Sequence, residues 1–150
     1  MTAISSIDDI RAGDVVPVLR KIVDRSTLVR YAGASDDYVY LHWDRPRVQE
    51  EGFPDVIIHG WLTFAYMTEA VSAWIPRELA DIQGYSVRYL RPMFPGIVDC
   101  SGRVLDVELA ENDRTIRLEI WAMDEAGQIT TSGNMRLTAC RPGRGTISLD

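Results

Sequence analysis

The sequence predicts an α+β fold in which a strongly curved antiparallel sheet wraps one apolar helix. One strand-like segment comes first, helical segments follow, and a run of strand-like segments ends the chain, which does not fit a parallel βαβ sheet. The segment 60–75 is apolar around most of its helical circumference, so other structure must cover it. At 150 residues the chain has the size of one domain, and we expect a single domain over residues 1–150.

The first elements are a strand and a helix. Valine and isoleucine residues within 15–22 predict the strand. Ser26-Thr27 predicts the start of a helix, and Gly33 followed by Ser35-Asp36-Asp37 is expected to end it and open a polar loop. Beyond this loop, Asp44 and Pro46 fit the cap and first turn of a second, short helix.

The remaining elements are one longer helix and a series of strands. Apolar residues recur at three- and four-residue steps through 60–75, which predicts the helix. After Gly84 the apolar pattern becomes strand-like, and a change of phase near Val104 predicts a β-bulge. The expected strands are 85–92, 97–109, 114–124 and 128–139, and the last two form an antiparallel hairpin.

Charge and cysteine usage limit the classes of function. The formal net charge of −6 disfavours binding to nucleic acid, and Lys21 is the only lysine, so an anion clamp would be built from arginine. Cys100 and Cys140 form no C-x-x-C motif, which favours a reducing compartment. No leader opens the sequence, and polar residues interrupt the stretch 61–75, so we expect a cytoplasmic protein without a membrane span.

Asp37 and His42 form a candidate acid–base pair. The chain has two histidines, His42 and His59, and Asp37 lies five residues before His42 in a predicted loop. Because histidine titrates near neutral pH, a carboxylate and an imidazole here would be able to share one water molecule. In the alternative interpretation, Asp36 and Asp37 cap a turn and His42 is a buried histidine with its hydrogen bonds satisfied.

Gly60 offers a backbone donor at the predicted start of the apolar helix. Unpaired N–H groups and the positive end of the helix dipole stabilise negative charge there, and a glycine lets a ligand approach. The alternative is that Gly60 only permits a tight entry into the helix. Metal-ligand spacing, a phosphate loop and a nucleophile elbow are all absent from the sequence, so no metal site is expected.

Four stretches of the sequence carry a resemblance to a known family. They read Tyr31-Ala-Gly-Ala-Ser-Asp-Asp37, His42-Trp-Asp44, Ile58-His-Gly-Trp-Leu-Thr63 and Val87-Arg-Tyr-Leu-Arg-Pro-Met-Phe-Pro-Gly96. The first three resemble the hydratase motif of the MaoC-like dehydratases, which have the hot-dog fold, and the fourth resembles their central strand and turn. The resemblance implies reversible syn addition of water to a trans-2-enoyl thioester, giving the (R)-3-hydroxyacyl thioester.

The resemblance also implies roles for individual residues. Asp37 and His42 become the catalytic pair, the N–H of Gly60 becomes the contact to the thioester oxygen, and Thr68 supports the site with a hydroxyl. The family usually reads Asp-x-Asn-Pro-x-His, whereas Val39 and Tyr40 occupy the Asn-Pro positions here. This departure removes a hydrogen-bonding side chain and a fixed φ, so the loop is expected to be held differently.

The remaining candidates concern substrate binding. Arg88 and Arg91 suit the phosphates of CoA or of a carrier-protein phosphopantetheine, or else they protect an exposed edge strand from aggregation. An acyl pocket is expected to be lined by aromatic residues that cluster around the motif, although core packing explains some of them. These residues are Tyr38, Tyr40, Trp43 and Trp61, with His59 beside them.

These observations lead to one hypothesis and two alternatives. We expect a dimeric hydratase or dehydratase of enoyl thioesters on CoA or acyl carrier protein, with no metal and no redox cofactor. One alternative is a non-catalytic acyl-thioester-binding subunit of a dehydratase heterodimer, because the Val39-Tyr40 departure touches the motif itself. The other is a thioesterase with the same fold.

Overall fold

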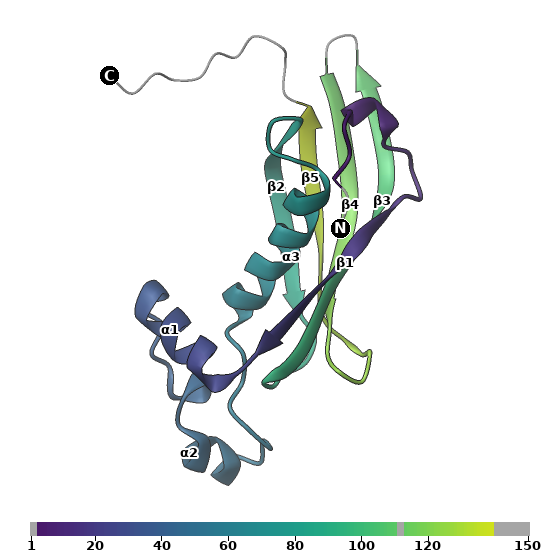
Figure 1. Cartoon of the computed structure of the whole chain (residues 1–150). Helices are drawn as coiled ribbons and strands as arrows, with labels where there is room; N and C mark the ends of the chain where they lie inside the picture. The colour runs from purple at the N-terminus through teal and green to yellow at the C-terminus, as the bar shows by residue number, and fades with distance from the viewer. Residues whose placement is uncertain (1–2, 111–112, 140–150) are drawn as a thin grey trace, which may run out of the picture.

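A five-stranded antiparallel sheet curves around helix α3, as expected from the sequence (Figure 1). The computed structural model describes residues 3–110 and 113–139. The strands are β1 (Val15–Val23), β2 (Ala80–Tyr89), β3 (Gly96–Ala110), β4 (Asp113–Met123) and β5 (Ile129–Ala139), in the order β1-β3-β4-β5-β2. The helices are α1 (Arg25–Ser35), α2 (Arg45–Glu50) and α3 (Gly60–Trp74), with short 3₁₀ helices at Ile7–Asp9 and Tyr40–His42.

The core lies between α3 and the sheet. Met67 and Val71 of α3 are fully buried, as are alternate residues of β4 such as Leu118. Burying each such side chain contributes roughly 1.5–3 kcal/mol, so the apolar pattern of 60–75 and the strand periodicity stabilise one another. Arg117 and Glu119 of β4 are exposed on the opposite face, which gives the alternation expected of a half-buried sheet.

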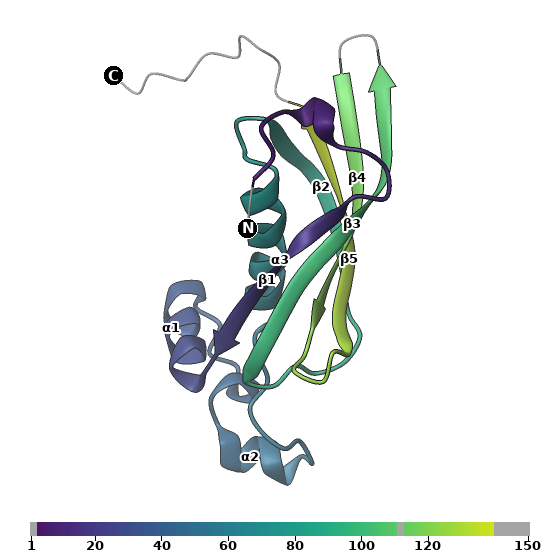
Figure 2. The same cartoon turned by 45° about the vertical axis from the view of Figure 1, so that its right-hand side comes forward.

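The smaller helices lie away from the sheet. Both views show α2 beyond the N-terminal end of α3 and α1 beside that end of the helix (Figure 2). The segment between β1 and α3, which contains α1 and α2, thus lies at the start of α3, while the sheet packs against the rest of that helix. Among residues 3–110 and 113–139, no helix combines the length and apolar character needed to cross a membrane.

Several expected elements are confirmed, and the start of one strand was wrong. Helix α3 and the hairpin of β4 and β5 lie where predicted, and the register of β3 shifts between Val104 and Asp106. Helix α1 continues through Gly33, at a cost of about 1 kcal/mol for one helical glycine, and ends at Ser35 with the left-handed Asp36 as its C-cap, within the predicted stop Ser35-Asp36-Asp37. Strand β2 begins at Ala80, before Gly84, because its pairing with β5 continues past the register shift there. The predicted strand position of Cys140 lies outside the described residues.

Two glycines sit on either side of Ile120 in one row across the sheet. Ile120 pairs with Gly102 of β3 on one side and with Gly133 of β5 on the other. A Cβ at Gly102 would lie 2.6 Å from the backbone oxygen of Glu119, and a Cβ at Gly133 would meet the backbone oxygen of Ser86. Because no side chain fits, these positions allow the strands to approach closely and the sheet to bend.

We predict that Gly133→Ala lowers the free energy of unfolding by about 1–3 kcal/mol, because its new methyl group meets backbone that cannot move aside. Gly84→Ala is the matched control in the paired strand β2, since a Cβ there would find only Arg136 Nη2 at 3.9 Å. We expect the control to change stability by no more than about 0.5 kcal/mol in urea unfolding. Equal effects of the two substitutions would contradict the close-approach argument.

Candidate active site

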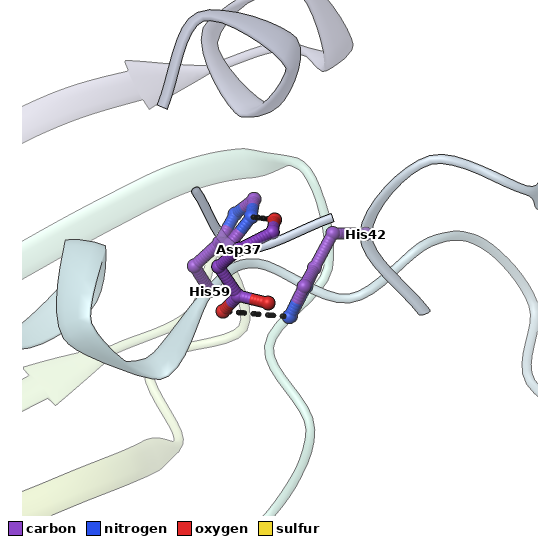
Figure 3. A group of neighbouring side chains, drawn as sticks. All are labelled: Asp37, His42 and His59. Atoms are coloured by element: carbon purple, nitrogen blue, oxygen red, sulfur yellow. Dashed lines mark hydrogen bonds and ion pairs between the residues drawn. The ribbon is translucent and has the colours of Figure 1, made fainter. Parts of the chain in front are cut away.

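The segment between β1 and α3 brings three ionisable side chains together at the start of α3 (Figure 3). Asp37 follows the end of α1, His42 ends the 3₁₀ helix Tyr40–His42, and His59 precedes the first residue of α3. Asp36 has a φ of 58°, a left-handed conformation that aspartate tolerates and that turns the chain just before Asp37. The three side chains therefore come from three different local structures: the turn after α1, a 3₁₀ helix and the residue before α3.

The Asp37 carboxylate faces the His42 ring. His42 Nε2 lies 3.8 Å from Asp37 Oδ2, and the side chains of His42 and Asp37 are 12% and 36% exposed. On its other side, His42 Nδ1 lies 2.6 Å from the backbone oxygen of Ile57. Since a carbonyl oxygen only accepts, Nδ1 carries a proton, and Nε2 is the atom left to exchange a proton with Asp37 or with water.

His59 supports this pair from behind. It is fully buried, and its ring stacks on His42 with 3.7 Å between centroids and 19° between planes. His59 Nε2 donates a hydrogen bond to the backbone oxygen of Asp37 at 3.2 Å, while Nδ1 has no partner among the described residues. One side chain thus contacts the ring of His42 and the backbone of Asp37.

The environment of His59 keeps its ring neutral. Burial lowers its pKa below the ordinary 6.5, and nearby His42 lowers it further, although the Asp37 backbone oxygen and carboxylate act in the opposite direction. A neutral His59 adds no positive charge next to His42. This side chain therefore acts through packing and one hydrogen bond.

The same three side chains are as close together as the ligands of a metal site, but the two histidine rings are not oriented to bind one ion. Ligand atoms of Asp37, His42 and His59 all lie within 4.8 Å of one another, a proximity that the sequence spacing of the histidines did not indicate. Imidazole nitrogens bind a metal ion in the plane of the ring at about 2.1 Å. The two stacked rings are nearly parallel, so their lone pairs do not converge on one ion. The arrangement suits proton transfer better than metal binding.

A cavity of about 500 Å³ opens beside the Asp37–His42 pair. Its lining includes His42, Gly60, Trp61, Tyr89, Arg91 and Thr131. The first N–H groups of a helix have no intrahelical partner and lie at the positive end of its dipole. No side chain caps those of α3 at His59. The cavity therefore places His42, whose Nε2 faces the Asp37 carboxylate, beside backbone donors suited to a developing negative charge.

Tyr89, which sequence analysis did not select, explains why residue 60 is a glycine. A Cβ at Gly60 would lie 2.8 Å from two ring carbons of Tyr89 and 3.2 Å from its hydroxyl oxygen. The space beside Gly60 is thus filled by a side chain from the end of β2. The only sequence signal was that Tyr89 lies within the motif 87–96. The contact of this residue with the start of α3 cannot be predicted from spacing in the sequence.

Two of the predicted binding residues lie at the cavity. Trp61 is 54% exposed and contacts Phe64 edge to face, and Arg91 makes a hydrogen bond to Gln128 Oε1. Both side chains line the cavity beside Gly60.

The other predicted binding residues lie elsewhere. The guanidinium of Arg47 lies 3.7 Å from the centre of the Tyr40 ring, whose hydroxyl donates to Glu51 at 3.1 Å, away from the cavity. Arg88 and Tyr38 are exposed outside the cavity lining. Thr68 lies two turns along α3, where its hydroxyl bonds the backbone oxygen of Phe64 and lines a separate cavity of about 440 Å³.

Known structures resemble this chain over most of its length. R-Hydratase PhaJ1 from Pseudomonas aeruginosa, in the unliganded form, has a TM-score of 0.79 and 21% identity, covering 90% of this chain and 85% of that one. The (R)-hydratase from A. caviae involved in PHA biosynthesis has a TM-score of 0.76 and 21% identity, covering 85% and 96%. The ChsH1-ChsH2 complex from Mycobacterium tuberculosis has a TM-score of 0.74 and 21% identity, covering 87% and 98%. These likenesses define the class: a hot-dog fold.

The sequence comparison identifies the family. The model of the MaoC-like domain matches residues 11–126, so the chain belongs to the MaoC-like dehydratase family, as the sequence motifs predicted. Protein MaoC of Klebsiella aerogenes is 27% identical over 90 residues. The matched region is 59% of this chain but only 27% of that longer protein.

We predict that His59→Gln flattens the dependence of stability on pH. The unfolded chain takes up a proton on His59 near the ordinary pKa of 6.5, whereas the folded chain resists it, so the free energy of unfolding falls as the pH drops below that value. Glutamine does not titrate but keeps a donor for the Asp37 backbone. Between about pH 8 and about pH 5, wild type should lose more stability than the variant in urea unfolding. Parallel losses would contradict a neutral, buried His59.

Proposed function

We propose that this protein is a hydro-lyase that reversibly adds water to trans-2-enoyl thioesters to give (R)-3-hydroxyacyl thioesters. The observation that carries the proposal is the 3.8 Å approach of His42 Nε2 to the Asp37 carboxylate, where the cavity meets the N-terminus of α3. Membership of a hydratase and dehydratase family supports it. Side chains and backbone supply every group that the reaction needs, so we propose no metal and no redox cofactor.

In the direction of hydration, His42 and Asp37 divide the proton transfers. His42 Nε2 takes a proton from water as the water oxygen bonds to C3, and the electrons of the double bond move toward the thioester oxygen. The N–H of Gly60 stabilises the negative charge on that oxygen. Asp37 delivers to C2 the proton that reaches it from His42 across their 3.8 Å gap, through a shared water. Dehydration reverses each step.

The loop at the departure from the family motif has its own stabilising contacts. Trp43 Nε1 donates to the backbone oxygen of Tyr38 at 2.9 Å, and the N–H of Val39 approaches Asp37 Oδ1 at 3.4 Å. Tyr40 is held between Arg47 and Glu51. These contacts restrain the loop where the missing Asn-Pro pair would have restrained it, which supports catalysis over a purely binding role.

The substrate is proposed to be a thioester of CoA or of an acyl carrier protein. Arg91 at the cavity and exposed Arg88 nearby on β2 are the candidates for its phosphates, because guanidinium groups suit phosphate. Trp61 offers an apolar surface for the acyl chain. Cys100 is a buried free cysteine whose pKa burial raises to about 12, which fits our proposal of a reducing, cytoplasmic location.

We predict that purified protein hydrates a short trans-2-enoyl-CoA, and that Asp37→Asn and His42→Gln each lower kcat/KM by about 10² to 10⁴. Asp36→Asn is the matched control, since it removes the neighbouring carboxylate and asparagine keeps the left-handed turn. Chromatography of the products distinguishes the outcomes. Free CoA would indicate a thioesterase, and an unchanged substrate would indicate a binding subunit. Full activity in both variants would reject the assigned pair.

We also propose a dimer formed through the sheet. Strands β1 and β2 are the two ends of the strand order, so each leaves one edge without a partner strand among the described residues. Such edges pair readily with another chain. Sedimentation velocity of the purified protein should therefore give the mass of two 16.9 kDa chains. An active monomer would contradict this prediction, and a dimer that forms only with a second protein would indicate a heterodimer.

A further inference from the structure

We infer that the Tyr89 hydroxyl is a second hydrogen-bond donor to the thioester oxygen that the Gly60 N–H binds. The inference rests on the proposed function and deepens it, because it assigns a catalytic residue to the same cavity. It depends on three features of the structure: the packing of Tyr89 against Gly60, the anchoring of Tyr89 at the end of β2, and the state of its hydroxyl.

Tyr89 and Gly60 face the same small volume. The phenol oxygen of Tyr89 lies 3.2 Å from the position that a Cβ of Gly60 would occupy, and two ring carbons lie 2.8 Å from it. Both residues line the cavity of about 500 Å³, together with His42. We therefore place an oxygen atom bound at the start of α3 in the part of the cavity that the phenol also lines. One carbonyl oxygen has two lone pairs and accepts two such bonds.

The backbone around Tyr89 is held firmly. Tyr89 pairs with Thr131 at the last position of the β2–β5 ladder. Directly after it, the N–H groups of Leu90 and Arg91 both donate to the backbone oxygen of Thr130, at 2.8 and 3.3 Å. A donor on a strand end costs little reorganisation when charge develops, which is the condition for effective electrostatic stabilisation.

The Tyr89 hydroxyl is a protonated donor with no other partner to satisfy. No hydrogen bond joins it to another side chain or backbone group of the described residues, and burial, with Tyr31 and Tyr85 nearby, raises its pKa above the ordinary 10.0. At neutral pH the phenol therefore keeps its proton. Tyr89 is 48% exposed, so water can bond the hydroxyl until a substrate carbonyl replaces it.

The decisive variant is Tyr89→Phe, which removes the hydroxyl and keeps the ring that packs on Gly60. We expect kcat for a short trans-2-enoyl-CoA to fall by about 10² to 10³, with little change in KM, because the lost bond strengthens only as charge develops. Tyr85→Phe is the matched control on the same strand; its ring contacts Phe64 at 4.6 Å between centroids, outside the cavity lining. Unchanged melting temperatures would exclude a folding defect in either variant.

A spectroscopic measurement tests the bond without turnover. Butyryl-CoA labelled with ¹³C at its carbonyl is not hydrated, and infrared difference spectra of the bound ligand report how strongly the carbonyl is polarised. We expect a smaller downward shift of the carbonyl stretch in Tyr89→Phe than in wild type and in Tyr85→Phe.

The two measurements separate the inference from the proposed function. Hydration by wild type, with Tyr89→Phe unchanged in kcat and in carbonyl stretch, would overturn the inference and leave the function standing. A Tyr89-dependent shift in a wild-type protein that does not hydrate enoyl thioesters would support the bond and overturn the function. Failure of wild type to bind butyryl-CoA would overturn both.

Discussion

The burial of α3 in the curved sheet is the constraint on which the candidate site depends. The helix is apolar on most of its surface, so it is stable only where β1, β3 and β4 cover it. That burial fixes the position of its first residue, Gly60, relative to the end of β2. The hydrophobic core therefore fixes the position of the backbone N–H groups at the start of α3.

The acid–base pair depends on a different kind of support. Asp37 and His42 belong to a segment outside the sheet, and neither side chain is part of the buried apolar core. His59 compensates for this by stacking on one ring and bonding the backbone of the other residue. Because His59 directly precedes α3, it connects the segment between β1 and α3 to the buried helix. The separation of Asp37 from His42 is thereby tied to the position of the buried helix.

The sequence allowed the fold to be predicted because its strongest signals are periodic. The all-round apolar pattern of 60–75 and the alternation in β4 and β5 follow directly from burial, and they identified α3 and the hairpin. Asp37 and His42 were found because both lie in one short loop that also carries a family motif. The start of β2 was less predictable, since its pairing with β5 continues past Gly84.

Contacts between distant segments could not be predicted in the same way. Tyr40 was grouped with the pocket because it is close in sequence to His42, yet its ring packs between Arg47 and Glu51. Tyr89 was passed over because only the pairing of β2 with β5 brings it to Gly60. The stacking of the two histidines likewise depends on the path of the whole segment between β1 and α3. Side-chain neighbours of this kind arise from the assembled sheet and helix.

The packing of Tyr89 on Gly60 has a consequence for how these two positions change during evolution. A Cβ at residue 60 would lie 2.8 Å from two ring carbons of Tyr89, so either the ring shifts or one of the two residues is small. Relatives that carry alanine at the start of this helix should carry a smaller residue at the end of the strand. Covariation between these two alignment columns would then mark the members of the family in which an aromatic ring packs on the glycine that begins the helix.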